Sequence, residues 1–137
     1  MANHNIIGKL GENIAIKYLK SKNYTIIDRN FDVKMGEIDI ICKKNDKTGE
    51  KLEKNIVFVE VKSKKVDSFL EIKDETFSPE TRLTKTKGQK ILKTIQHYLS
   101  FNKINEKDID IKIIAIIVFL NIKLKKAKIK IYENYIL

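Results

Sequence analysis

The sequence predicts an α/β protein in which helices flank one mixed β-sheet. Three observations lead to this fold class: two segments carry apolar residues at helical spacing, five short segments are rich in β-branched residues, and they follow the order α-β-β-β-α-β-β. The chain has 137 residues and is 42% hydrophobic. These values predict a single domain over residues 1–137 that folds without disulfides or a structural metal.

The first predicted element is a helix over residues 6–20. Its apolar residues recur at helical spacing, at Ile7, Leu10, Ile14 and Tyr18. The stretch SKN at residues 21–23 ends the helix, because Asn tolerates the left-handed backbone conformation that is common at helix C-termini.

Three strands are predicted next. YTIIDRNF (24–31) and EIDIICK (37–43) flank the turn VKMG (33–36), and the polar segment 43–55 connects them to IVFVEVKS (56–63). Each run is rich in Ile, Val, Phe or Tyr, which favour strands.

The second half of the chain begins with a mixed segment, residues 64–83, whose length is typical of a functional connection. A helix over residues 84–101 follows. Its apolar stripe consists of Ile91, Ile95, Tyr98 and Leu99, with Lys87 one turn earlier. The strand 109–120 is apolar enough to be buried on both faces. A turn near Lys125–Lys126 then leads into a last strand through Ile131.

Several features point to a protein of the cytoplasm. Cys42 is the single cysteine, so no intrachain disulfide can form, which fits a reducing compartment. The N-terminal segment has no apolar core of signal-peptide length. The longest apolar run, Ile113–Leu120, is far shorter than a membrane span, so we expect no membrane association.

The net charge of +10 predicts a polyanionic partner, and nucleic acid is the first choice. Only Arg29 and Arg82 are arginines, and every other basic residue is a lysine. An AT-rich coding sequence would also produce many lysines, so the charge favours a nucleic-acid partner without establishing one.

Acidic residues interrupt two of the predicted strands. Asp39 lies in GEIDII, and Glu60 lies in VFVEVKS two residues before Lys62. Because side chains alternate along a strand, Glu60 and Lys62 share one face. The same alternation places Ile38 and Ile40 together on the face opposite Asp39. If the two strands form a hairpin, the three polar groups converge at one sheet surface.

Two neighbouring carboxylates raise each other's pKa, and a divalent cation relieves their repulsion more fully than one lysine does. Mg²⁺ binds oxygen ligands, and Mn²⁺ is the alternative ion. Such an ion supports hydrolysis of a phosphodiester, with Lys62 stabilising negative charge or positioning a water molecule. The other interpretation is an ordinary cross-strand ion pair on an exposed sheet face.

Four stretches together resemble a known family: GKLGENIAIKYLKSKNYTIIDRNF, GEIDII, VFVEVKS and TKTKGQKILKTIQHYL. Their content and order resemble the UPF0102 family from Gly8 to about Ile136. That family is similar to the PD-(D/E)xK nuclease superfamily, close to archaeal Holliday-junction resolvases. The resemblance implies a restriction-endonuclease-like fold and, by analogy, metal-dependent cleavage of DNA, including branched repair or recombination intermediates.

The resemblance also implies roles for individual residues. Asp39 and Glu60 match the metal-binding acids, and Lys62 matches the catalytic lysine. Glu12 matches the glutamate that joins the catalytic and metal-binding set in resolvase-like members, and the carbonyl of Val61 is a further metal ligand. Glu37 matches a supporting acid.

The predicted nucleic-acid contacts are lysines, namely Lys64, Lys85, Lys87 and Lys90. A homodimer is expected, because enzymes that cut four-way junctions need two sites. The sequence departs from the family pattern at Asn23, Lys64 and Lys112, where glycine, arginine and aspartate are common. Two other functions stay open: a nucleic-acid-binding module without hydrolysis, and a protein-interaction domain whose acids pair with lysines.

Overall fold

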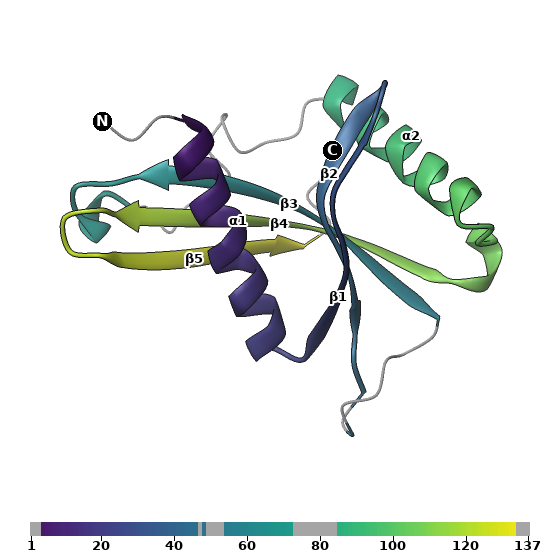
Figure 1. The fold of residues 1–137 in the computed structure, drawn as a ribbon, viewed down its shortest axis with the longest axis horizontal. Helices are drawn as coiled ribbons and strands as arrows, with labels where there is room; N and C mark the ends of the chain where they lie inside the picture. The colour runs from purple at the N-terminus through teal and green to yellow at the C-terminus, as the bar shows by residue number, and fades with distance from the viewer. Residues whose placement is uncertain (1–3, 47, 49–53, 73–84, 134–137) are drawn as a thin grey trace.

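The structure is a computed structural model, and it describes residues 4–46, 48, 54–72 and 85–133. Within them, two helices lie on opposite faces of a five-stranded sheet (Figure 1). The elements are α1 (His4–Ser21), β1 (Tyr24–Val33), β2 (Gly36–Lys44), β3 (Asn55–Lys65), α2 (Lys85–Phe101), β4 (Asp110–Asn121) and β5 (Lys126–Glu133). The predicted order and α/β class are confirmed, and the arrangement is consistent with a restriction-endonuclease-like fold.

The strands lie side by side in the order β1-β2-β3-β4-β5. Only β3 and β4 run parallel, because α2 belongs to the crossover between them, and the other neighbours are antiparallel. Two short 3₁₀ helices, Phe69–Glu71 and Glu106–Asp108, were not predicted. Each is too short to leave a periodic pattern. Residues 73–83 of the predicted long connection lie outside the described residues.

Helix α1 covers one face of the sheet, with its buried residues slightly offset from the predicted stripe. Ile7, Ala15 and Leu19 are buried in the cluster on this face, whereas Leu10 is 39% exposed. The buried line therefore passes through Gly11, one position along from Leu10. Small residues at this line let the helix axis approach the strands closely.

Helix α2 covers part of the other face, and the predicted stripe is confirmed at Ile95, Tyr98 and Leu99, with Ile91 half-buried beside them. Ile95, Tyr98 and Leu99 are buried against Phe58 of β3. Tyr98 meets Phe58 edge to face, with ring centroids 5.7 Å apart. Among the described residues, neither helix is long and apolar enough to span a bilayer.

The side chains of β2 do not alternate as predicted. Ile40 belongs to the cluster under α1, but Ile38 belongs to the cluster under α2. The backbone change lies opposite, in β1, where Arg29 pairs with Ile40 and Phe31 pairs with Ile38. Between them, Asn30 has a φ of 52°, a left-handed conformation that interrupts regular strand geometry. Alternation therefore fails at Asp39, which lies between the two isoleucines.

Candidate active site

The candidate site lies where β2 stops pairing with β3. The last pair of that ladder is Ile40 with Val59, whereas β3 remains paired with β4 as far as Lys65. Just beyond the last pair, Asp39 Oδ2 accepts a hydrogen bond of 2.8 Å from the backbone N–H of Val61. The Asp39 side chain thus takes the place of the β2 main chain as the partner of β3.

This hydrogen bond also fixes where the carbonyl of Val61 points. In a regular strand, the N–H and C=O of one residue point to the same side. Because the Val61 N–H points to Asp39, its carbonyl oxygen faces the same opening between β2 and β3. The predicted backbone ligand therefore faces the candidate site.

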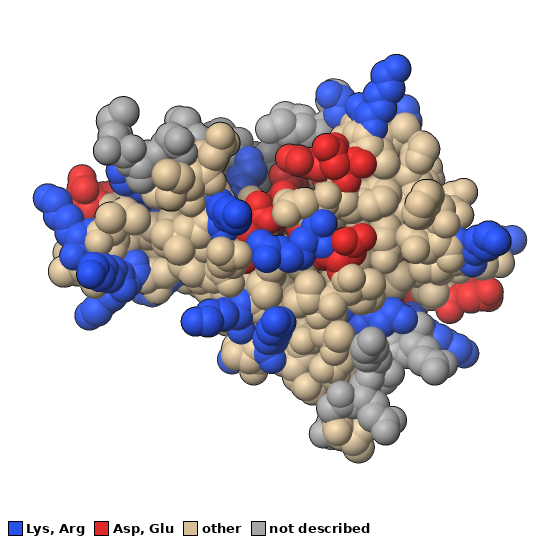
Figure 2. Space-filling model, in the orientation of Figure 1, with Lys and Arg blue, Asp and Glu red and all other residues tan. Residues whose placement is uncertain are grey.

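Three glutamates lie within electrostatic reach of Asp39. The pKa of Asp39 is raised from 3.8 to about 7, first by burial, which the hydrogen bond from the Val61 N–H partly offsets, and then by the charges of Glu12, Glu60 and Glu37 in decreasing order. Figure 2 shows acidic side chains gathered near the middle of one face, with basic side chains beside them. Asp39 and Glu60 therefore interact electrostatically, and Glu12 and Glu37 act on Asp39 as well.

Glu12 enters the site from α1, and its side chain is 20% exposed. Its Oε1 atom is buried and accepts no hydrogen bond. The Arg29 guanidinium lies beside it, with Nη2 3.9 Å from Glu12 Oε1, and the same Nη2 donates a hydrogen bond of 3.0 Å to Asn13 Oδ1. We did not predict this role for Arg29, although an arginine in so lysine-rich a chain was a usable signal.

A close helix–strand contact holds Glu12 over the sheet. A Cβ atom at Gly11 would overlap Ser63 Oγ and would lie 2.9 Å from Ser63 Cβ. By contrast, a Cβ at Gly8 would meet no atom within 4 Å. Of these two glycines in the GxxGE motif, Gly11 therefore seats α1 against β3 and brings Glu12 to the site.

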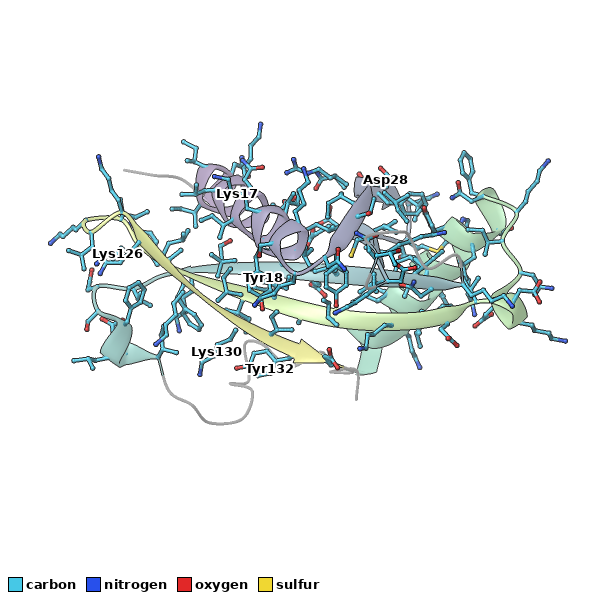
Figure 3. The ribbon with its side chains drawn as sticks, turned by 90° about the horizontal axis from the view of Figure 1, so that it is seen from below. Lys17, Tyr18, Asp28, Lys126, Lys130 and Tyr132 are labelled. Carbon is cyan, nitrogen blue, oxygen red and sulfur yellow. The ribbon has the colours of Figure 1, made fainter. Side chains whose placement is uncertain are left out.

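The predicted catalytic lysine and the lysines predicted to bind nucleic acid lie on two different elements, β3 and α2. Lys62 and Lys64 follow Glu60 on β3, on the face opposite α1, where Lys130 and Tyr132 also project (Figure 3). Lys62 is half-buried, and Lys64 is exposed. Lys90 is exposed on α2. The side chains of Lys85 and Lys87 lie outside the described residues.

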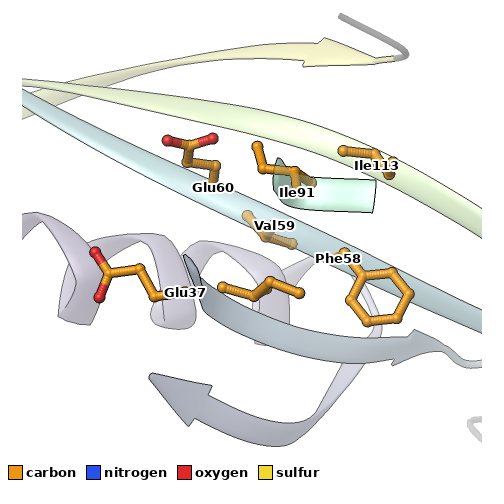
Figure 4. Close-up of a pocket in the computed structure, with 7 residues that line it drawn as sticks. Glu37, Phe58, Val59, Glu60, Ile91 and Ile113 are labelled. Carbon is orange, nitrogen blue, oxygen red and sulfur yellow. The ribbon is translucent and has the colours of Figure 1, made fainter. Parts of the chain in front are cut away.

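A small pocket adjoins the acids on the α2 side of the sheet. Glu37 and Glu60 lie at one side of it, and Phe58, Ile91 and Ile113 form apolar walls (Figure 4). Gly36 lets β2 pack closely against α2 beside this pocket, because a Cβ at residue 36 would lie 2.8 Å from the Thr94 hydroxyl of α2. Two of the four carboxylates therefore border a pocket with an apolar floor.

The donor set suits a hard divalent cation. Carboxylate and backbone carbonyl oxygens are the ligands that Mg²⁺ takes, and Glu12 Oε1, which accepts no hydrogen bond, is a buried acceptor of this kind. In the described part of the chain, no three acidic, His or Cys side chains stand close enough to form a metal-binding group as they are.

Comparisons with known proteins agree with this arrangement of motifs. The model of the uncharacterised protein family UPF0102 matches residues 11–116, which include Glu12, Asp39, Glu60 and Lys62. A UPF0102 protein of Campylobacter hominis is 38% identical over 125 residues, covering 90% of this chain and 87% of the relative. One from Alkaliphilus oremlandii is 38% identical over 128 residues (93% and 95%), and one from Clostridium botulinum is 40% identical over 102 residues (74% and 70%). The chain belongs to the UPF0102 family.

Proposed function

We propose that this protein is a Mg²⁺-dependent hydrolase of phosphodiester bonds in nucleic acid, with DNA as the first substrate to test. One observation carries the proposal: the half-buried carboxylate of Asp39 is held by the Val61 N–H and interacts electrostatically with Glu12 of α1 and Glu60 of β3. Burial and mutual repulsion raise the pKa of Asp39 to about 7. Such a cluster is costly unless a cation or substrate compensates its charge.

The residues of the chain have separate tasks in this proposal. Asp39, Glu60 and Glu12 hold the cation, and the Val61 N–H keeps Asp39 oriented toward it. A bound Mg²⁺ supplies polarisation of a phosphoryl oxygen and a lower pKa of a coordinated water. Lys62, two residues beyond Glu60 on the same face, stabilises negative charge on the phosphate.

A second function is a nucleic-acid-binding module without hydrolysis. The observation that favours it is the spacing of the acids, since no described trio is already arranged around a cation. Like the first proposal, it uses the net positive charge of the chain to bind phosphates, but it expects no cleavage under any metal condition.

The test incubates purified protein with linear, nicked, flapped and four-way-junction DNA, and with RNA, in Mn²⁺, Mg²⁺ or EDTA. We expect cleavage that requires the metal and that is absent in Glu60→Gln. Salt-dependent binding by wild-type protein with no cleavage of any substrate would instead establish the binding module.

A further inference from the structure

The register of the sheet gathers lysines and aromatic residues on one face next to the candidate site. Ile129 and Ile131 of β5 pack toward α1, so Lys128, Lys130 and Tyr132 project from the opposite face. Figure 3 shows Lys130 and Tyr132 on the side of the sheet away from α1. Lys128 and Lys130 of β5 therefore lie on the same face of the sheet as Lys62 and Lys64 of β3.

The pairing of β3, β4 and β5 aligns these side chains in rows. One row is Glu60–Ala115–Tyr132, the next is Lys62–Ile117–Lys130, and the third is Lys64–Phe119–Lys128. Residues of one row share a face because paired residues in a sheet project to the same side. Glu60 is the only carboxylate in the three rows.

The rows place basic and aromatic side chains at regular intervals along the strands. Successive rows lie roughly 7 Å apart along the strands, and β3 and β5 are separated by roughly 10 Å across β4. Lys64 and Lys128 therefore flank Phe119, which is half-buried. Tyr132, also half-buried, packs against Ala115 in the row of Glu60.

We propose that this surface, the basic face (Lys64, Phe119, Lys128, Lys130 and Tyr132), binds a single-stranded nucleic-acid segment that continues into the candidate active site. The inference rests on the proposed function for its direction, since the row of Tyr132 contains Glu60. Basic side chains beside aromatic rings are the means by which proteins bind single strands. Paired bases in a duplex are stacked on one another, so their faces do not reach Phe119 or Tyr132.

The test measures binding of a labelled single strand, and of its own duplex, in EDTA across a series of salt concentrations. The variant is Lys128→Gln/Lys130→Gln. Its matched control is Lys17→Gln/Lys20→Gln, which removes the same charge from exposed positions on α1, on the other side of the sheet (Figure 3).

Loss of two phosphate contacts should make the salt dependence of single-strand binding shallower by about 1.4 in log K against log salt. The α1 control should keep the wild-type slope. Tyr132→Leu should weaken single-strand binding roughly fivefold or more without changing the slope, because it removes stacking and no charge. Thermal unfolding of each variant identifies any that fail to fold, and the lysine pair remains informative without the Tyr132 variant.

Equal losses in the two lysine pairs, or no loss in either, would overturn the basic face. An equal loss for duplex and single strand would overturn its preference for single strands. If only the Lys128→Gln/Lys130→Gln variant loses single-strand binding and the wild-type protein cleaves no substrate, the basic face is supported and the nuclease is rejected. If the protein cleaves nucleic acid but binds it equally well without Lys128 and Lys130, the nuclease is supported and the basic face is rejected.

Discussion

Substitution of Asp39 by Asn should stabilise the metal-free protein at pH 8. Burial and the neighbouring carboxylates raise the pKa of Asp39 to about 7, so the folded state holds this proton more tightly than the unfolded chain does. Between about pH 4 and pH 7 the unfolded chain therefore releases the proton first, and stability falls as pH rises. Asn carries no charge and can still accept the hydrogen bond from the Val61 N–H.

The size of the expected stabilisation follows from the pKa shift of Asp39. A rise from 3.8 to about 7 corresponds to an upper limit of about 4 kcal/mol above pH 7, at 1.36 kcal/mol per pK unit. We expect roughly half of this, because Asp39 is only partly buried and solvent screens its neighbours. For a domain of this size, about 2 kcal/mol raises the melting temperature by roughly 8 °C.

The assay is thermal and urea unfolding in EDTA at pH 4 and pH 8, with Asp32→Asn at an exposed β1 position as the matched control. Wild type and Asp39→Asn should differ at pH 8 and come close to each other at pH 4, where Asp39 is protonated in the folded state and partly protonated in the unfolded chain. Added Mg²⁺ at pH 8 should then stabilise wild type, by about 2.7 kcal/mol at 100 times its Kd, and leave Asp39→Asn unchanged. A wild-type protein as stable as Asp39→Asn at pH 8 would refute the reasoning.

Three further predictions concern the site and its supports. Glu60→Gln should abolish metal-dependent cleavage with unchanged circular dichroism, because it removes a ligand at a half-buried surface position; residual cleavage would assign the metal elsewhere. Lys62→Ala should lose cleavage but keep the Mg²⁺-induced rise in melting temperature, and losing both would contradict its separate role. Gly11→Ala should destabilise the fold by about 1–3 kcal/mol through overlap with Ser63, whereas Gly8→Ala should stabilise it by about 0.5–1 kcal/mol in urea unfolding. Equal effects of the two alanines would show that Gly11 is not the contact point.

Local patterns in the sequence were sufficient for most of the fold. The helices and strands follow from apolar spacing that each segment carries by itself, as in Ile95, Tyr98 and Leu99 of α2. The nearness of Asp39 and Glu60 followed from assuming a hairpin between their strands. Strict alternation failed at Ile38, in a stretch where the neighbouring strand holds the left-handed residue Asn30, and the local residue pattern gives no sign of this conformation.

The supports of the site were harder to predict, because they join residues from different elements. The approach of Arg29 to Glu12 depends on how α1 crosses β1, and the Gly11–Ser63 contact depends on how closely α1 lies to β3. Neither crossing is encoded in a local pattern. The hydrogen bond from Val61 to Asp39 likewise depends on where the β2–β3 ladder ends.

The most direct test of the central claim is a crystal of the protein soaked in Mn²⁺ and examined by anomalous diffraction. We predict one anomalous peak in the opening between β2 and β3, with carboxylate oxygens of Asp39 and Glu60 roughly 2.1 Å from it, close to the coordination distance of Mg²⁺. A peak bound elsewhere, or ordered carboxylates with no peak between them at saturating Mn²⁺, would contradict the claim that these residues share a divalent cation.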